Sequence, residues 1–193
     1  MIILIILVGI LLIYILTTFN SLRTFQVRIK ASIQEIGNQL KRQTELIPNL
    51  VESAKGYLKH EKEIFDKLTE ARTAVLQAIN SGNAQKMIES QEVLAKAIQP
   101  LRVIVESNPQ LQAAGVVTKL MDELRDTADK VMYARRTLID LTADYNTKLV
   151  TIPSGWIASL FGFKKEQGLQ TATEGSHLEV EPEETKTPKV TLQ

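Results

Sequence analysis

Two patterns of hydrophobic positions divide the chain. The first is an unbroken apolar run, because no charged side chain precedes Arg23 and one uncharged stretch covers residues 2–22. At about 1.5 Å of rise per residue, roughly twenty helical residues cross a hydrocarbon core of about 30 Å. The run therefore predicts a membrane anchor over residues 1–21, in which the lipid-facing side chains include Ile2, Ile5, Leu12, Leu16 and Phe19.

This first run could also be a cleaved secretory signal. Such a signal carries Lys or Arg before the apolar run and a small-residue cleavage site after it. Neither feature stands in MIILIILVGILLIYIL or in the residues that follow it. The pattern favours an anchor that is retained.

The second pattern runs from Leu22 to Leu149, where apolar residues recur at steps of three and four, as in helices that each bury one stripe. The stripes predict helical segments over 22–58, 64–80, 84–105 and 117–149. Asn80-Ser81-Gly82-Asn83 and Ser107-Asn108-Pro109 are typical helix stops. No alternating strand pattern of useful length competes, so the predicted fold class is all-α.

Short connections between long helices predict an antiparallel up-and-down bundle. The first two segments could form one helix bent at Pro48, which gives three helices. The chain could instead reverse between Gly56 and His60, which gives four. With four helices the last one ends at the membrane surface where the first began.

An apolar segment closes this helical region at residues 152–163, which read IPSGWIASLFGF. It is too short to span a bilayer, and it places Trp156, Phe161 and Phe163 just before Lys164 and Lys165. Aromatic side chains followed by cations suit a membrane interface. The same side chains could instead cap the open end of the bundle core. The interfacial interpretation favours four helices, since only then does this segment return to the lipid.

The remaining residues, 164–193, are rich in Gln, Thr, Glu, Gly and Pro, with an acidic run over 179–184. This composition predicts a disordered tail. The predicted domain organisation is thus an anchor at 1–21, a helical bundle at 22–163 with its closing segment at 152–163, and the tail.

Charge indicates where the bundle lies and what it does not bind. Arg23, Arg28, Lys30, Lys41 and Arg42 follow the span. Because positive flanks stay in the cytoplasm, we expect the N-terminus outside and the bundle at the inner face of the cytoplasmic membrane. The net charge of +1 and the 5% of aromatic residues give no global field for nucleic acid. The chain has no Cys, which removes disulfides from consideration in either compartment.

Candidate chemistry is sparse. Di-metal sites in bundles need Glu-x-x-His pairs on two helices, and the chain has only His60 and His177. Asp122, Asp126 and Asp129 share a helix face, but Arg125 and Lys130 interleave with them, so a solvated surface is the expected reading. No phosphate loop, nucleophile elbow or kinase motif appears. We therefore expect no metal, no cofactor and no small-molecule substrate, and a protein that is not an enzyme.

Two prolines interrupt predicted helices and are candidate hinges. Pro48 cannot donate to the carbonyl of Thr44, and Pro100 leaves the carbonyl of Lys96 in the same position. Each could instead be a bend that follows the bundle surface. The stretch LIPNL around Pro48 is the better hinge candidate.

Several ordered landmarks resemble the LemA family of bacterial membrane-anchored proteins. They are LKRQTELIPNLVESAKGYLKHEKE, LTEAR, VESNPQLQA, YARR, DYNT and PSGWIASLFGF, in that order between Leu40 and Phe163. The resemblance covers nearly the whole chain, and it implies an N-terminal anchor and an antiparallel four-helix bundle. It implies no reaction. The chain departs from the family pattern at Asn108, where an aromatic is usual, at Gln43, where a second Arg is frequent, and at Pro100.

Two functions remain after these exclusions. The first is a single-pass, membrane-anchored scaffold or adaptor whose bundle binds a protein partner. The alternative is a membrane-organising protein that acts through lipid contacts of the anchor and the Trp156 segment. An enzyme without a recognisable motif is the weakest class.

Overall fold

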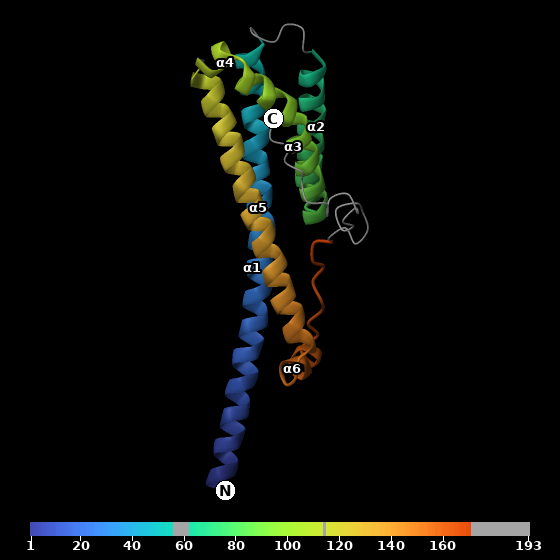
Figure 1. Cartoon of the computed structure of the whole chain (residues 1–193). Helices are drawn as coiled ribbons and strands as arrows, with labels where there is room; N and C mark the ends of the chain where they lie inside the picture. The colour runs from blue at the N-terminus through green and yellow to red at the C-terminus, as the bar shows by residue number, and fades with distance from the viewer. Residues whose placement is uncertain (56–61, 114, 171–193) are drawn as a thin grey trace, which may run out of the picture.

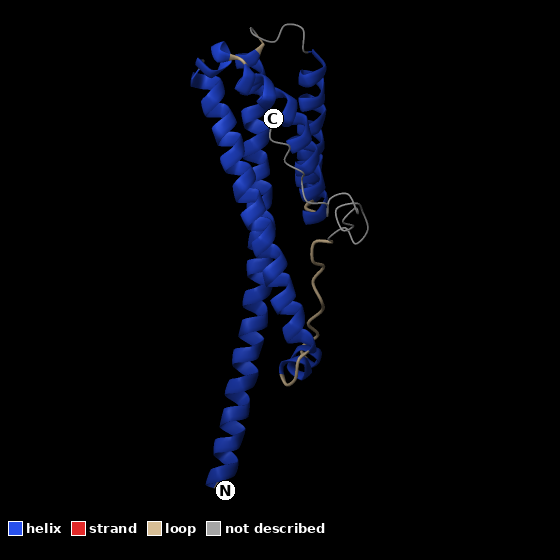
Figure 2. Ribbon diagram, in the orientation of Figure 1, coloured by secondary structure: helices blue, strands red, loops and turns tan. Residues whose placement is uncertain are grey.

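The structure is a computed structural model that describes residues 1–55, 62–113 and 115–170, and the regular elements of these residues are all helices (Figure 2). The predicted all-α class is confirmed. The helices are α1 (Ile2–Ala54), α2 (Lys62–Ser81), α3 (Ala84–Ser107), α4 (Pro109–Ala113), α5 (Gly115–Val150) and α6 (Ser154–Leu160).

Helix α1 extends the length of the molecule and begins with the predicted anchor (Figure 1). Its most apolar window has a mean hydropathy of 3.0 and is only 6% buried, as expected of a candidate membrane span. The same helix continues without interruption into the core, where Leu22, Ile36 and Leu40 are fully buried. The apolar run and the first core segment are therefore one helix, about 80 Å long at 1.5 Å per residue.

Helices α1 and α5 pack along a seven-residue repeat. On α1 every seventh residue from Leu22 is buried, and on α5 every seventh residue from Val117 is buried. These positions are Leu22, Ile29, Ile36, Gln43 and Leu50 on α1, and Val117, Leu124, Val131, Leu138 and Tyr145 on α5. A seven-residue apolar repeat keeps one stripe of each helix against its partner over many turns, as in a coiled coil.

Three of the side-chain hydrogen bonds between α1 and α5 show how these helices lie against each other. Gln26 of α1 bonds to Tyr145 of α5, Ser32 bonds to the carbonyl of Ala134, and Gln43 bonds to the carbonyl of Leu124. Residue numbers rise along α1 while they fall along α5, so these two helices run in opposite directions.

A tight turn joins α2 and α3. Gly82 has φ +65°, which suits glycine because a Cβ is unfavourable in the left-handed region. The Asn83 side chain then accepts a hydrogen bond from the amide of Lys86 at 3.0 Å and caps α3. The helix stop predicted at residues 80–83 is confirmed.

Helices α2 and α3 lie beside the half of α1 that is far from the N-terminus, and α5 continues past them toward α6 (Figure 1). Leu68 and Val75 of α2 and Leu94 and Leu101 of α3 are fully or almost fully buried in one core with α1 and α5. The short helix α4 was not foreseen. The Asn108 side chain starts it by accepting from the amide of Gln110 at 2.9 Å.

Two predicted boundaries differ in the structure. The first segment was expected to extend to Leu58, but α1 ends at Ala54 and α2 begins at Lys62, while the predicted reversal from Gly56 to His60 lies outside the described residues. The tail was expected to begin at Lys164, but residues 164–170 form an extended segment that packs on the bundle. Its contacts come from Tyr145 and Asn146, whose side chains hydrogen-bond to its backbone. Residues 171–193 lie outside the described part.

Candidate membrane-surface site

The closing segment lies beside α1 at the point where the apolar run ends. The chain leaves α5 at Val150, turns through residues 151–153 and forms α6, which contacts both α1 and α5. The hydroxyl of Ser154 donates to the carbonyl of Lys148 at 2.8 Å and so satisfies one of the free carbonyls at the end of α5. This arrangement returns the chain to the exit of the anchor.

Gly155 allows the close approach of α6 to α5. A Cβ on this residue would lie 2.9 Å from the carbonyl oxygen of Leu149, which is backbone and cannot rotate away. The sequence PSG thus combines a turn, a hydroxyl that satisfies the end of α5, and a residue without a side chain at the contact.

Three phenylalanines pack together where α6 meets α1. The ring of Phe19 lies edge-on to Phe161 at 5.0 Å and to Phe163 at 5.5 Å between centroids. The guanidinium of Arg23 lies 5.3 Å from the centroid of Phe19 and 4.9 Å from that of Phe163. Aromatic edge contacts and cations over rings are both favourable. The structure therefore brings the predicted anchor residue Phe19 together with the predicted interfacial residues Phe161 and Phe163.

Lys148 makes a further link between α5 and this part of α1. The ammonium of Lys148 donates to the hydroxyl of Ser21 at 2.8 Å and lies 5.1 Å from the centroid of Phe25. Lys148 thus holds the end of α5 against α1 where the predicted anchor ends.

The two faces of α6 differ sharply. Ile157 and Ala158 are buried, whereas Trp156 is 68% exposed and Leu160 is 76% exposed. The segment therefore closes the core with one face and presents large apolar side chains with the other. Lys164 and Lys165, which follow, are both exposed. The contact of Trp156, Phe161, Phe163, Lys164 and Lys165 with lipid stays a prediction.

The anchor residues lie as a lipid-facing helix requires. Ile2, Ile5, Leu12 and Leu16 are each more than half exposed, and Phe19 is partly covered by the closing segment.

The segment over residues 164–170 is fastened by two residues of α5. The hydroxyl of Tyr145 accepts from the amide nitrogen of the Gln26 side chain at 3.1 Å and donates to the carbonyl of Lys164 at 3.0 Å. The side chain of Asn146 bonds to both the amide and the carbonyl of Glu166. At its end, the amide of Gln170 donates to the side chain of Gln85 on α3. We call residues 164–170 the strap.

Tyr145 couples α1 to the strap through a fully buried ring. Burial, and then the nearby Glu166 carboxylate, raises the pKa of the Tyr145 hydroxyl above its ordinary value. The neutral phenol is therefore the form that the fold holds, and only this form can donate to Lys164.

Neither Pro48 nor Pro100 ends its helix, because α1 and α3 continue through them. The carbonyl of Thr44, which Pro48 leaves without an amide donor, accepts a hydrogen bond from the Nε of Arg72 on α2 at 2.9 Å. The carbonyl that lacks a donor within α1 thus accepts a hydrogen bond that joins α1 to α2. Motion about Pro48 or Pro100 stays a prediction.

Two of the three aspartates that share a face of α5 are paired with cations of the same helix. Asp122 lies 3.6 Å from Arg125, and Asp126 lies 2.7 Å from Lys130. Within residues 1–55, 62–113 and 115–170, no group of three His, Cys, Asp or Glu side chains is arranged to hold a metal ion. His60 and His177 fall outside this part of the chain.

The sequence did not predict the roles of four residues. Arg23, Tyr145 and Lys148 organise the end of the bundle near the predicted anchor, and Arg72 links α1 to α2. Arg23 was counted only as a flanking charge. The signal for Arg72 was available, because an interior proline leaves a carbonyl that needs a donor. No local signal points to Tyr145 or Lys148, since their partners are distant in the sequence.

The chain matches the sequence model of a known protein family. The sequence model of the LemA family matches residues 32–190, which is most of the chain. No curated protein matches the chain.

Proposed function

The chain belongs to the LemA family, and from this premise we propose that it is a single-pass, membrane-anchored scaffold whose helical bundle binds a protein partner at the inner face of the cytoplasmic membrane. One observation carries the proposal: α1 is both the candidate span and the central helix of the core. A surface on such a bundle is held at a set height and angle above the lipid. The proposed role includes no catalytic step, cofactor or small-molecule substrate.

The proposed architecture is an antiparallel up-and-down bundle of α1, α2, α3 and α5. It is supported by the opposite directions of α1 and α5 and by the two-residue turn between α2 and α3. With this topology the end of α5 lies near the membrane exit of α1, where Lys148 bonds to Ser21.

The proposed orientation puts the N-terminus outside. Its support is the set of cations after the span, beginning with Arg23 and Arg28. Single cysteines introduced at exposed positions of the bundle, such as Met132, and labelled in intact cells with a membrane-impermeant reagent test it. Protection until the membrane is opened is expected, and labelling in intact cells would overturn the orientation.

The partner-binding role is tested in membranes with the full chain. Photoreactive side chains placed singly at exposed bundle positions are expected to give a protein adduct at a cluster of neighbouring positions. Adducts that are equally weak at every position, or that consist of lipid alone, would contradict a scaffold for proteins.

A second function has an observation in its favour. The exposed Trp156 and Leu160 lie on α6 next to the exit of the span, which supports a protein that organises lipid through this segment. Trp156 is the only tryptophan, so its fluorescence reports this site alone. In nanodiscs with brominated lipids, quenching of Trp156 is expected if α6 lies in the interface, and unquenched emission would remove this candidate.

A further inference from the structure

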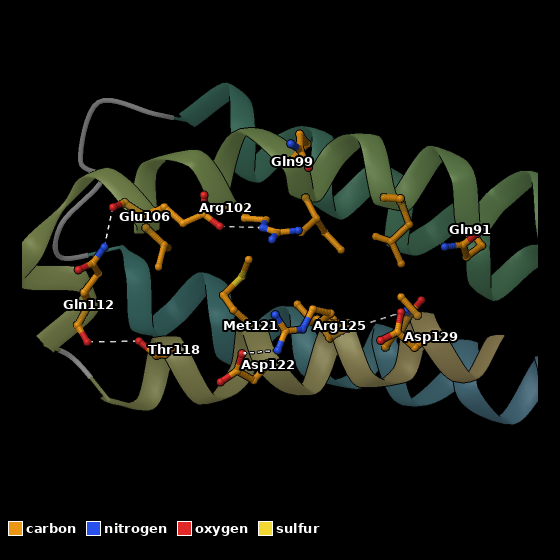
Figure 3. A pocket seen from close by; sticks show the side chains of 17 residues that line it. Gln91, Gln99, Arg102, Glu106, Gln112, Thr118, Met121, Asp122, Arg125 and Asp129 are labelled. Atoms are coloured by element: carbon orange, nitrogen blue, oxygen red, sulfur yellow. Dashed lines mark hydrogen bonds and ion pairs between the residues drawn. The ribbon is translucent and has the colours of Figure 1, made fainter. Parts of the chain in front are cut away.

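The neighbouring helices α3 and α5 enclose a cavity of about 600 Å³ at the end of the bundle away from the anchor. Figure 3 shows side chains of the two helices facing each other across it. Its apolar lining includes Leu94 and Ile98 from α3 and Met121 and Leu124 from α5. Along most of α3, then, the seam with α5 is open rather than packed.

Side-chain contacts lie at both ends of this cavity. At one end the Gln112 side chain donates to the carbonyl of Glu106, and Thr118 donates to the carbonyl of Gln112 (Figure 3). At the other end Arg135 of α5 pairs with Glu92 of α3 at 3.4 Å. From Glu92 to Glu106, α3 rises about 21 Å at 1.5 Å per residue. The opening is therefore a groove about four helical turns long.

A buried polar atom at the cavity has no partner. The Gln43 side chain of α1 lines the cavity, and the residue is only 2% exposed. Its nitrogen donates weakly to the carbonyl of Leu124 at 3.4 Å, while its Oε1 has no hydrogen-bond partner among the described residues. A buried acceptor without a donor is unfavourable, so a group that donates to Oε1 would be stabilised here.

The charges around the groove also favour a group that donates hydrogen bonds or carries a positive charge. Arg102 is paired with Glu106 along α3, and Arg125 is paired with Asp122 along α5 (Figure 3). Asp129, which also lines the cavity, has no ion-pair partner within the described part of the chain. The lining thus has one acidic group more than it has bases, and the Asp129 carboxylate is the acidic group without an ion-pair partner.

We propose that the groove between α3 and α5 is the partner-binding surface, and that its occupant is an amphipathic helix of the partner whose apolar stripe carries or adjoins a Lys or Arg. This inference rests on the proposed scaffold function and names the site and the partner's chemistry. Apolar side chains of a helix recur every three or four residues, which is also the spacing of Leu94, Ile98 and Arg102 along the wall. The cation of the partner meets the exposed carboxylate of Asp129.

The test uses the full chain in its own membranes, with a benzophenone amino acid at Ala95, which is exposed and lines the groove. Val103, exposed on the same helix and outside the groove, is the matched control position. Mass spectrometry of the adduct at Ala95 is expected to identify an amphipathic helical segment with Lys or Arg next to its apolar stripe.

A charge reversal sharpens the result. Asp129→Lys is expected to reduce the Ala95 adduct about tenfold, as loss of a close charge pair does, while Asp140→Lys on the exposed surface of the same helix leaves it unchanged. Circular dichroism checks that both variants remain folded.

The outcomes separate the two proposals. An adduct at Val103 or elsewhere on the bundle but not at Ala95 overturns the groove and leaves the scaffold function standing. An adduct at Ala95 with an acidic segment, with a non-helical segment or with lipid also overturns the groove assignment. If no bundle position gives a protein adduct, the scaffold function itself fails.

Discussion

Helix α5 faces two neighbours in two different ways. Against α1 it buries a residue at every seventh position from Val117 to Tyr145. Against α3 it leaves a cavity of about 600 Å³. The packed contact with α1, the closed seam, holds the bundle to the helix that carries the predicted anchor. The contact with α3, the open seam, has apolar walls, an unpaired acceptor and space for a bound segment. Stability and binding are thus assigned to different sides of one helix.

The largest expected effect comes from breaking the closed seam. Leu138→Ala removes a side chain that is almost fully buried between α5 and α1, and large-to-small changes at such sites cost about 2 to 5 kcal/mol. Ile139→Ala, on the neighbouring and partly exposed residue, is the control and should cost about 0.5 kcal/mol or less. Thermal unfolding of the full chain in detergent, followed by circular dichroism, measures both. Equal losses of stability in the two variants would show that the contact between α5 and α1 does not stabilise the bundle.

The next effect concerns the join between α1 and α2. Arg72→Met leaves the carbonyl of Thr44 without a donor, and an unsatisfied buried group costs about 1 to 3 kcal/mol. Pro48→Ala restores an amide that can donate to this carbonyl, so Arg72→Met should cost less in that background. A double-mutant cycle in denaturant measures the coupling.

Additive losses in this cycle would show that Arg72 does not compensate for Pro48. Arg125→Met, which removes an exposed arginine with a surface pair, is the matched control and should change the free energy of unfolding little.

A smaller effect is expected at the strap. Tyr145→Phe keeps the buried ring but removes the two part-buried bonds to Gln26 and Lys164, at about 0.5 kcal/mol each. Because the folded-state pKa of Tyr145 is raised, its stabilising contribution is complete below the unfolded value of about 10 and is lost as pH rises through the folded value.

Hydrogen exchange of the strap amides measures this loss of stability. Exchange at residues 164–170, corrected for the intrinsic rate, is expected to accelerate above pH 10 in the original chain and to be faster in Tyr145→Phe than in the original chain below that pH. Equal protection in the two proteins would show that the hydroxyl does not hold the strap.

The smallest effect is expected in the open seam, and it has the opposite sign. Gln43→Met keeps a side chain of similar shape and removes the unpaired oxygen, so the free energy of unfolding should rise by up to about 1 kcal/mol. Denaturant unfolding measures it. A loss larger than that of Tyr145→Phe would mean that Gln43 supports the core rather than a guest.

Much of this fold follows from local sequence. The apolar run predicts where α1 starts, and the three- and four-residue spacing predicts the all-α fold class. The Gly82-Asn83 turn predicts where α2 joins α3. Each of these features depends on residues close together in the chain. The strap does not follow in this way, since it depends on Asn146 meeting the backbone of Glu166 across a turn of the chain. Glu and Gln in residues 164–170 have the composition of a tail, and only the side chains of α5 make them a strap.

The candidate sites were less predictable than the fold. The aromatic content of residues 152–163 predicts a segment at the end of the apolar run, and the structure packs Phe161 and Phe163 on Phe19 there, while contact with lipid stays a prediction. The groove could not be predicted from the sequence, because Gln43 is an ordinary polar residue there. Only the folded arrangement of three helices shows that its side chain is buried. Cavities arise where packing is incomplete, and a periodic apolar stripe predicts that a helix is buried without predicting how completely.

The central claim is that one unbroken helix joins the anchor to the bundle, and hydrogen exchange of the full chain in nanodiscs tests it most directly. We expect continuous slow exchange from Ile15 through Ile36, including the amides between Asn20 and Gln26 where the helix leaves the lipid. Fast exchange confined to residues 20–26 would show a flexible joint and would contradict the account.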